Sequence, residues 1–392
     1  MKYNFDEIND RSNTNCEKYD KRKEIFGTED VIPLWVADMD FKVAPSIVDA
    51  LRKCTEHQIF GYTFQSQSYF ESIINWQKRR NNWDIKQEWI LYTPAVVPGL
   101  NLAVQSLTSE GDKIVIMPPV YRPFFNCVIN NNRILLENRL AHNGLDYFID
   151  FDDLEEKLKD AKMLIFCNPH NPVGRVWRRN ELEKVAELCL KHKVIIVSDE
   201  IHSDLIFAPH KHISIASLSE EIADLCITFF APSKTFNIAG LVSGVAVASN
   251  KEIYDKYCFH LKRLSIDQGN LYGVTALEAA YSTGDEWLEQ LLEYVSSNAK
   301  FVIDFFEKNL PQVKVKHPEG TYLQWIDFSA LNLSQRELTD FLVYEAKVGM
   351  NDGTAFSDSE GIGFMRLNLA CPRAIIEKAL NQVLTAYNKR QQ

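Results

Sequence analysis

The sequence lacks the features that would make it a disulfide-stapled, zinc-binding or membrane protein. It has no C-x-x-C pair, and its eight cysteines lie far apart, so neither a disulfide framework nor a metal site is expected. No apolar run approaches the length that spans a bilayer, and the polar, acidic first ten residues are not a signal peptide. We therefore expect a cytoplasmic protein with free thiols and no membrane contact.

The chain also lacks an excess of positive charge, low-complexity tracts and repeats. Its formal net charge is −10, whereas binding to a nucleic-acid backbone needs a basic surface, so we expect no nucleic-acid partner. The 392 residues have the composition of an ordinary globular protein and are enough for roughly two or three domains.

Short apolar runs alternate with helical patterns through the middle of the chain. We predict strands at 90–93, 114–117, 134–137, 163–167, 194–197, 226–230 and 245–248. This order is typical of an α/β doubly wound sheet, in which ligands bind at the carboxyl ends of the strands. The loops that carry Tyr121, Asn171, Asp199 and Lys234 all follow predicted strands, so we expect them to meet at one edge.

After residue 285 the pattern changes to long helices with two strand-like segments. The helices are predicted at 286–310, 335–346 and 372–387, and the strands at 320–325 and 363–369. We predict a large domain of residues 46–285 and a smaller α+β domain made of residues 1–45 and 286–392.

Lys234 lies in a short polar turn directly after the strand at 226–230. Most lysines in turns are solvated, which is the plain interpretation. A lysine at the end of a buried strand can instead be desolvated, and its neutral amine can then act as a nucleophile or form a Schiff base. This stretch alone leaves both interpretations open.

Three other places in the sequence could contribute to a binding site, but none of them indicates a function by itself. Pro98 suits the first position of a helix running to 107, so the amides near Val96 and Val97 would form a phosphate site at a helix N-terminus. Asp38 lies in the apolar segment 34–41 and either lines a cavity or belongs to a capped turn. Arg366 lies in an apolar strand and is either a structural ion pair or a clamp for a carboxylate.

Together these residues meet the needs of pyridoxal phosphate. That cofactor requires a lysine for its aldehyde, an acid at the ring nitrogen, donors to the phenolic oxygen, an aromatic face and a helix N-terminus for its phosphate. Lys234 would form the Schiff base, and Asp199 would hold the ring nitrogen. The remaining cofactor-binding residues would be His202 and Asn171 at the phenolic oxygen, Tyr121 on the ring, and Val96, Val97 and Ser233 at the phosphate.

Four motifs are similar to those of fold-type I pyridoxal-phosphate enzymes, the aminotransferase superfamily. They are Asn168-Pro-His-Asn-Pro-Val-Gly, Asp199-Glu-Ile-His, Ser233-Lys-Thr-Phe-Asn and Arg366-Leu-Asn. The segments 35–41, 199–202 and 363–372 also resemble the MalY/PatB cystathionine β-lyase (C–S lyase) family. The resemblance covers nearly the whole chain, and it implies the aminotransferase-like fold type I.

The resemblance also implies an activity, an assembly and further site residues. It implies a carbon–sulfur β-lyase that cleaves L-cystathionine or related S-substituted L-cysteines to a thiol, pyruvate and ammonia. It implies a homodimer in which Tyr62 reaches the partner subunit's cofactor phosphate and assists near the leaving group. Substrate would be bound by Arg366 at its carboxylate, with Asn171, Tyr121, Trp35 and Asp38 around it.

The sequence departs from the wider superfamily at three positions. Ala231 and Val242 stand where many aminotransferases have a hydroxyl and an arginine on the phosphate, and His202 stands where aspartate-type enzymes have tyrosine. These differences count against an ordinary aminotransferase. An aminotransferase is nevertheless the first alternative, and a regulatory binding protein with vestigial activity is an alternative of another class.

Overall fold

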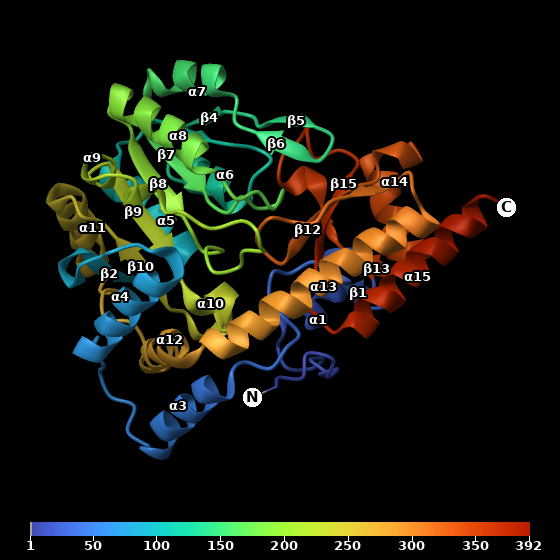
Figure 1. Ribbon diagram of the computed structural model, residues 1–392, viewed down its shortest axis with the longest axis horizontal. Coiled ribbons are helices and arrows are strands. Elements are labelled where there is room, and N and C mark those ends of the chain that lie inside the picture. The colour runs from blue at the N-terminus through green and yellow to red at the C-terminus, as the bar shows by residue number, and fades with distance from the viewer. Residues whose placement is uncertain (1) are drawn as a thin grey trace.

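Seven strands from the middle of the chain form one mixed sheet, which lies at the centre of the larger part of the molecule (Figure 1). In spatial order they are β2 (Ile90–Thr93), β10 (Gly244–Val247), β9 (Cys226–Phe230), β8 (Ile195–Asp199), β7 (Ala161–Cys167), β3 (Lys113–Ile116) and β4 (Ile134–Glu137). Strand β10 pairs antiparallel with both neighbours, and the others run parallel. This computed structural model, which describes residues 2–392, confirms the predicted α/β doubly wound fold and all seven strands.

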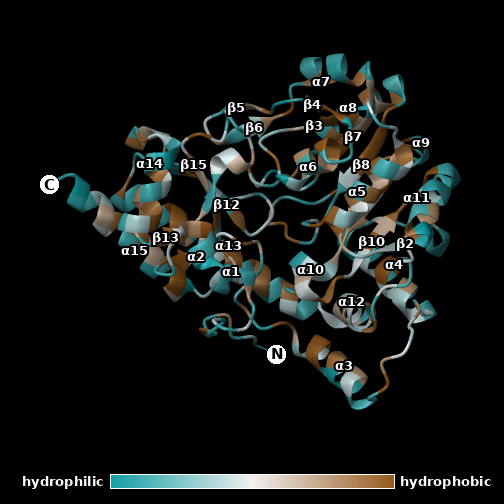
Figure 2. Ribbon diagram, turned by 180° about the vertical axis from the view of Figure 1, so that it is seen from behind, coloured by the Kyte–Doolittle hydropathy of each residue, from teal (hydrophilic) through white to brown (hydrophobic). Residues whose placement is uncertain are grey.

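Helices cover both faces of the sheet, which explains why its strands are continuous apolar runs. On β3, Ile114 and Ile116 belong to one hydrophobic cluster, whereas Val115 and the following Met117 belong to the other. Figure 2 shows hydrophobic residues concentrated along β7 and β8 and hydrophilic ones on outlying helices. One face packs on α5 (Val96–Leu107), α6 (Pro123–Ile129) and α11 (Lys251–Arg263), and the other on α4 (Gln67–Asn81), α7 (Phe151–Leu158), α8 (Arg179–His192) and α12 (Leu271–Thr283).

The C-terminal part contains a second, antiparallel sheet and two long helices. The sheet has the order β11 (Lys314–Val315), β12 (Leu323–Asp327), β15 (Phe364–Asn368) and β14 (Asn351–Asp352). Helix α13 (Asp285–Asn309) runs beside α15 (Arg373–Arg390), as Figure 1 shows. The helix predicted at 335–346 is only partly α-helical, because α14 (Gln335–Asp340) continues as a π-helix at Phe341–Glu345.

The N-terminal segment lies beside the C-terminal part before the chain enters the large sheet. After α1 (Glu17–Asp20) and α2 (Arg22–Phe26), strand β1 (Ile32–Pro33) pairs in parallel with β13 (Val348–Gly349). Helix α3 (Pro45–Glu56) then packs on α12. This route supports the division into residues 46–285 and residues 1–45 with 286–392, which we keep as a proposal.

The remaining elements are short connections. They are the hairpin β5 (Ala141–Asn143) and β6 (Asp146–Phe148), the helices α9 (Glu220–Ala223) and α10 (Pro232–Thr235), and 3₁₀ turns at Gln87–Trp89, Ile215–Ser217, Ala239–Leu241, Ser329–Leu331 and Gly353–Ala355. Within residues 2–392, no helix has the length and apolar character needed to cross a membrane.

Candidate active site

A cavity of about 170 Å³ lies where the loops after β2, β7, β8 and β9 meet. It is lined by Ala37, Ala95, Val96, Val97, Tyr121, Cys167, Asn171, Asp199, Ile201, His202, Ser233, Lys234, Ala239, Val242 and Ser243. The sequence prediction that the loops carrying Tyr121, Asn171, Asp199 and Lys234 meet at one sheet edge therefore agrees with the structure. A larger hollow of about 860 Å³ between α4 and α13 contains none of the predicted site residues, and we take the smaller cavity as the candidate site.

Lys234 lies on α10, the single turn that begins at Pro232 directly after β9. Its Nζ donates a hydrogen bond of 2.6 Å to the carbonyl oxygen of Ala37. Part of the side chain borders the cavity, but protein encloses the amine, and burial lowers the pKa of Lys234 to about 8. The turn is fixed by Thr235, whose Oγ1 donates to the buried Asp204 carboxylate at 2.8 Å. The structure thus presents an amine that is much easier to deprotonate than an exposed lysine.

Asp199 ends β8, and its carboxylate is buried at the cavity wall. Its Oδ1 accepts a hydrogen bond of 3.0 Å from the Ile201 amide. Burial, reinforced by the neighbouring Glu200, raises the pKa of Asp199 to about 7. A buried carboxylate with this pKa is stabilised by any cationic donor that enters the cavity.

His202 and Tyr121 are largely enclosed and face the same cavity. Burial lowers the pKa of His202 to about 3, so its imidazole is neutral at neutral pH, and its buried Nδ1 has no hydrogen-bond partner in the structure. Burial raises the pKa of the Tyr121 phenol. Both side chains can therefore meet a ligand as neutral groups.

The cavity ends at the N-terminus of α5. The helix begins at Val96, with Ala95 as its extended N-cap, so the prediction that Pro98 opens it was wrong by two residues. No side chain caps this end, which leaves the first amides of the helix, at Val96 and Val97, without an intrahelical acceptor. A helix end of this kind favours an anion.

Two serines border the same cavity as the start of α5. Ser233, which the sequence singled out, borders the cavity. Ser243 also borders it, and its Oγ is buried. Sequence reasoning missed Ser243, because no motif in the residues around it indicates that its hydroxyl could contact a ligand.

Arg366 lies on β15 with only 4 % of its surface exposed. Its Nη1 donates to Asn171 Oδ1, and its Nη2 donates to the Trp35 carbonyl and to Asn351 Oδ1, each at 3.1 Å. Its Nε is buried without a partner, and the guanidinium lies 4.8 Å from the centre of the Phe356 ring. Burial lowers the pKa of Arg366 to about 10, so it stays charged at neutral pH.

Residues Trp35–Met39, here called the N-terminal strap, cross the site without regular structure. The Trp35 indole donates to the Lys18 carbonyl at 3.1 Å, and the Asp38 carboxylate is paired with Arg11 at 2.5 Å. Asp38 still acts on Lys234 electrostatically and raises the pKa of its amine against the larger effect of burial. Neither Trp35 nor Asp38 is among the side chains that line the cavity, whereas Ala37 between them is.

Tyr62 is not brought to the cavity within this chain. It lies in the segment between α3 and α4, and its side chain is fully exposed. Sequence reasoning gave no role to three residues that hold the site together: Tyr322, Asn351 and Asn368. Asn368 belongs to the Arg366-Leu-Asn motif, and its role could have been inferred, because alternation along a strand puts it on the same face as Arg366.

The residues around the cavity fit pyridoxal phosphate. The cavity combines a lysine amine of lowered pKa with a buried acid that forms no ion pair within residues 2–392. It also contains a neutral imidazole whose Nδ1 has no hydrogen-bond partner among those residues. The uncapped N-terminus of α5 also borders the cavity, and a phosphate would be favoured there. In residues 2–392 no cluster of three or more histidine, cysteine or acidic side chains is arranged to hold a metal ion.

Comparison with known proteins identifies the family. Residues 29–383 match the model of aminotransferase class I and II, and the chain belongs to that family, whose members use pyridoxal phosphate. The chain is 43 % identical over 385 residues to cystathionine beta-lyase PatB of Bacillus subtilis, which covers 98 % of this chain and 99 % of that protein.

Two solved structures with bound pyridoxal phosphate match over nearly their full length. Cystalysin from Treponema denticola superposes with a TM-score of 0.96 at 38 % identity and covers 99 % of this chain and 100 % of that one. A protein from Clostridium difficile 630, provisionally described as an aminotransferase, superposes with a TM-score of 0.97 at 49 % identity and covers 98 % and 100 %. These matches confirm the aminotransferase-like fold type I and the cofactor expected from the sequence.

Proposed function

We propose that this protein is a pyridoxal-phosphate-dependent carbon–sulfur β-lyase. Its substrate would be L-cystathionine or a related S-substituted L-cysteine, and its products a thiol, pyruvate and ammonia. The observation that carries this proposal is the full-length similarity to a cystathionine beta-lyase in a chain whose cavity joins Lys234 and Asp199. His202, three residues after Asp199, stands where aspartate-type aminotransferases have tyrosine, and this difference also favours a lyase.

Different residues of the cavity would bind different parts of the cofactor. When bound, pyridoxal phosphate supplies a ring that withdraws electrons from the bonds at the substrate's Cα. Asp199 would hold the proton on the ring nitrogen, because a buried carboxylate of raised pKa gains most from a cationic donor. The remaining contacts would be those of His202 and Asn171 at the phenolic oxygen, Tyr121 on the ring face, and Val96, Val97 and Ser233 at the phosphate.

Lys234 would anchor the cofactor and then move the substrate's Cα proton. A base works best when its pKa lies near the working pH, and burial has brought the pKa of Lys234 to about 8. The Ala37 carbonyl accepts one N–H of this amine and cannot donate, so the lone pair of the neutral amine stays available for the proton.

Arg366 would bind the substrate's α-carboxylate. Its planar guanidinium is held by Asn171, Asn351 and the Trp35 carbonyl, while its Nε has no partner in the structure. A carboxylate at Nε would satisfy that donor with a charge-assisted hydrogen bond. Trp35 and Asp38, which lie on the N-terminal strap, would line the entrance of the site and would not contact the reacting bond.

The segment of residues 57–66 supports a homodimer with shared sites. Ile59, Phe60, Tyr62 and Phe64 all expose more than half of their surface there, which is costly unless another surface covers them. A second copy of the chain would bury this segment and let Tyr62 reach the partner subunit's cofactor phosphate. We also propose a cytoplasmic location, in keeping with eight cysteines that all remain free thiols.

The test is an assay with L-cystathionine and purified, cofactor-loaded protein. A lyase should release pyruvate and a free thiol in equal amounts without any added 2-oxo acid. An aminotransferase, which the description of the Clostridium difficile structure favours, would turn over only when a 2-oxo acid is supplied. Failure with every S-substituted cysteine, together with turnover on addition of a 2-oxo acid, would replace the first proposal by the second.

The alternative of another class, a regulatory binding protein, makes a different prediction. Lys234→Ala should abolish catalysis, because among residues 2–392 no other lysine lines the cavity. A biological role that survives this substitution unchanged would belong to binding and not to chemistry.

A further inference from the structure

The Ala37 carbonyl oxygen accepts two hydrogen bonds from side chains on opposite parts of the chain. Lys234 Nζ donates at 2.6 Å, and the Tyr322 hydroxyl donates at 2.9 Å. A carbonyl oxygen has two lone pairs, so these two donors fill it. The direction in which Lys234 meets this oxygen therefore depends on which lone pair Tyr322 occupies.

The shared acceptor is held rigidly from both sides along the strap. Asn368 Nδ2 donates to the carbonyls of Val36 and Asp38, each at 2.6 Å, and Arg366 donates to the carbonyl before them. On the other side Asn237 contacts both the amide and the carbonyl of Met39, at 2.9 and 3.0 Å. The Ala37 carbonyl consequently cannot turn to follow a moving donor.

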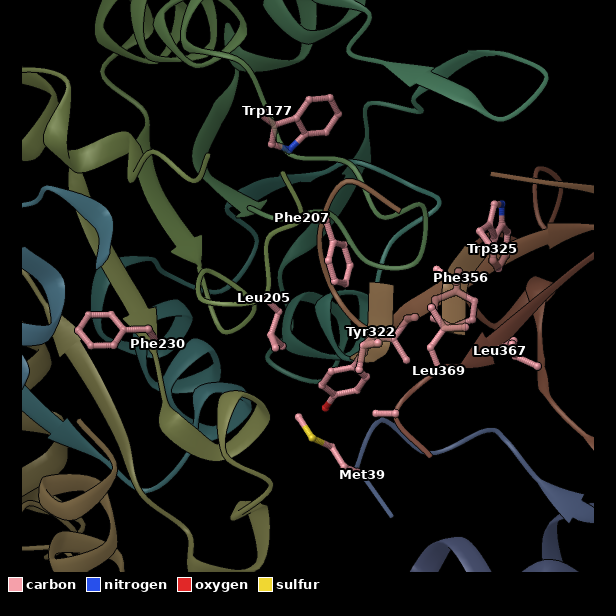
Figure 3. Packing of buried hydrophobic residues seen from close by; sticks show 14 of the residues in the cluster. Met39, Trp177, Leu205, Phe207, Phe230, Tyr322, Trp325, Phe356, Leu367 and Leu369 are labelled. Carbon is pink, nitrogen blue, oxygen red and sulfur yellow. The ribbon is translucent and has the colours of Figure 1, made fainter. Parts of the chain in front are cut away.

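Tyr322 is itself fixed in place. Only 1 % of its surface is exposed, and its ring lies edge-on to His202, with 6.0 Å between the ring centres and 81° between their planes. Its backbone carbonyl accepts from the Leu369 amide at 2.8 Å. Figure 3 shows its hydroxyl turned toward the N-terminal segment that carries Met39. Burial also raises the pKa of Tyr322 well above its ordinary value, so the phenol remains a donor throughout the working range.

We propose that Tyr322 is a positioning residue for the proton transfer by Lys234. Its hydroxyl occupies one lone pair of the Ala37 carbonyl and confines the lysine N–H to the other, which aims the free lone pair of the amine into the cavity. The proposal rests on the proposed function, since it concerns the state in which the Lys234 amine is free to take the Cα proton. Errors of about 1 Å in such a placement cost up to about 100-fold in rate.

A purely structural role for Tyr322 makes a different prediction. In that case loss of the hydroxyl would reduce stability and leave the lysine amine unchanged. Tyr147 provides the matched control, because it too is fully buried and its hydroxyl makes one hydrogen bond, accepted from Trp325 Nε1 at 3.0 Å. Tyr147 does not border the cavity.

The experiment compares Tyr322→Phe with Tyr147→Phe in the cofactor-loaded protein. For Tyr322→Phe we expect kcat on L-cystathionine to fall by about tenfold to 100-fold while KM changes by less than about twofold. Exchange of the Cα proton of L-alanine with heavy water, which reports proton transfer without a leaving group, should fall by the same factor. Tyr147→Phe should match the unsubstituted protein in both measurements, although its unfolding temperature should also fall.

A second readout needs neither turnover nor cofactor. The pH dependence of Lys234 acetylation is measured in the cofactor-free protein by mass spectrometry of the peptide. In Tyr322→Phe the whole carbonyl is left to the lysine, which favours the ammonium form, so the midpoint should rise by about half a pH unit. Tyr147→Phe should leave the midpoint unchanged.

Two results would overturn the proposal. One is Tyr322→Phe with kcat, proton exchange and acetylation midpoint all equal to those of the unsubstituted protein. The other is an equal loss in Tyr147→Phe, which would make the effect one of general packing. If the unsubstituted protein shows neither elimination nor proton exchange, the proposed function fails, and the acetylation midpoint alone then decides whether Tyr322 governs the amine.

Discussion

The buried acid at the end of β8 allows a prediction about stability. Replacing it should change the stability of the protein in opposite directions without and with the cofactor. We expect Asp199→Asn to stabilise the cofactor-free protein above pH 7. Burial raises the pKa of Asp199 from 3.8 to about 7, so between these values the folded chain keeps a proton that the unfolded chain has lost. Stability therefore falls as the pH rises through this window, and the full cost is present above pH 7.

The size of the effect follows from the same pKa. At about 1.4 kcal/mol for each pH unit, the rise corresponds to ~4 kcal/mol of stability lost above pH 7. Asparagine has no proton to lose, so the variant should lack this fall. The two proteins should be about equally stable near pH 4 and differ by several kcal/mol at pH 8.

The assay is urea unfolding of both proteins, freed of cofactor, at intervals from pH 4 to pH 8.5. Groups other than Asp199 titrate in both proteins, so only the difference between the two curves is interpreted. With pyridoxal phosphate bound, the ring nitrogen gives the carboxylate a cationic partner, and the order should reverse, with the variant less stable at pH 8. Parallel curves without cofactor would refute the argument that burial penalises this carboxylate.

Three further predictions concern binding, packing and the N-terminal charges. Arg366→Lys keeps the charge but loses the planar fork, so we expect KM for L-cystathionine to rise by at least about tenfold; an unchanged KM would contradict the carboxylate role. Gly99→Ala should destabilise the protein by about 1–3 kcal/mol in urea unfolding, because its Cβ would lie 2.7 Å from Phe229, and a neutral result would mean that α5 can shift. Lys18→Met should cost about 3–5 kcal/mol in the same assay, since Lys18 is fully buried and its Nζ lies 2.8 Å from the Asp40 carboxylate; a loss below ~1 kcal/mol would show that the remaining arginine partner suffices.

The central sheet was predictable because both of its faces are buried. A strand such as β9 is then a continuous apolar run, and its ends coincide with the polar loops that carry the chemistry. The start of α5 was predicted two residues late, since Pro98 is compatible with the first turn of a helix without defining its first residue. The change from α-helix to π-helix after α14 has no counterpart in the periodicity of the sequence, and Phe341 and Leu342 within it are buried in the core.

The site residues also divide into those that the neighbouring sequence indicates and those whose importance depends on contacts with distant parts of the chain. Lys234, Asp199 and Asn171 could be singled out because each lies at the end of a strand of recognisable pattern or within four residues after it. Tyr322 and Asn351 could not, because what makes them relevant is a contact with a segment about 300 residues earlier or with a neighbouring strand. Their roles, like those of all the site residues, remain predictions for the experiments described above.

The N-terminal strap has a consequence for the synthesis of the protein. Ala37 is synthesised 285 residues before Tyr322, and Trp35 is synthesised 331 residues before Arg366. The carbonyls of the strap are nevertheless bonded by Tyr322, Arg366 and Asn368. Until β15 has emerged, the strap has no partners for these groups, and the lysine on α10 has no fixed acceptor. We therefore expect a nascent chain to fix the acceptor of Lys234 only after β15 has been synthesised.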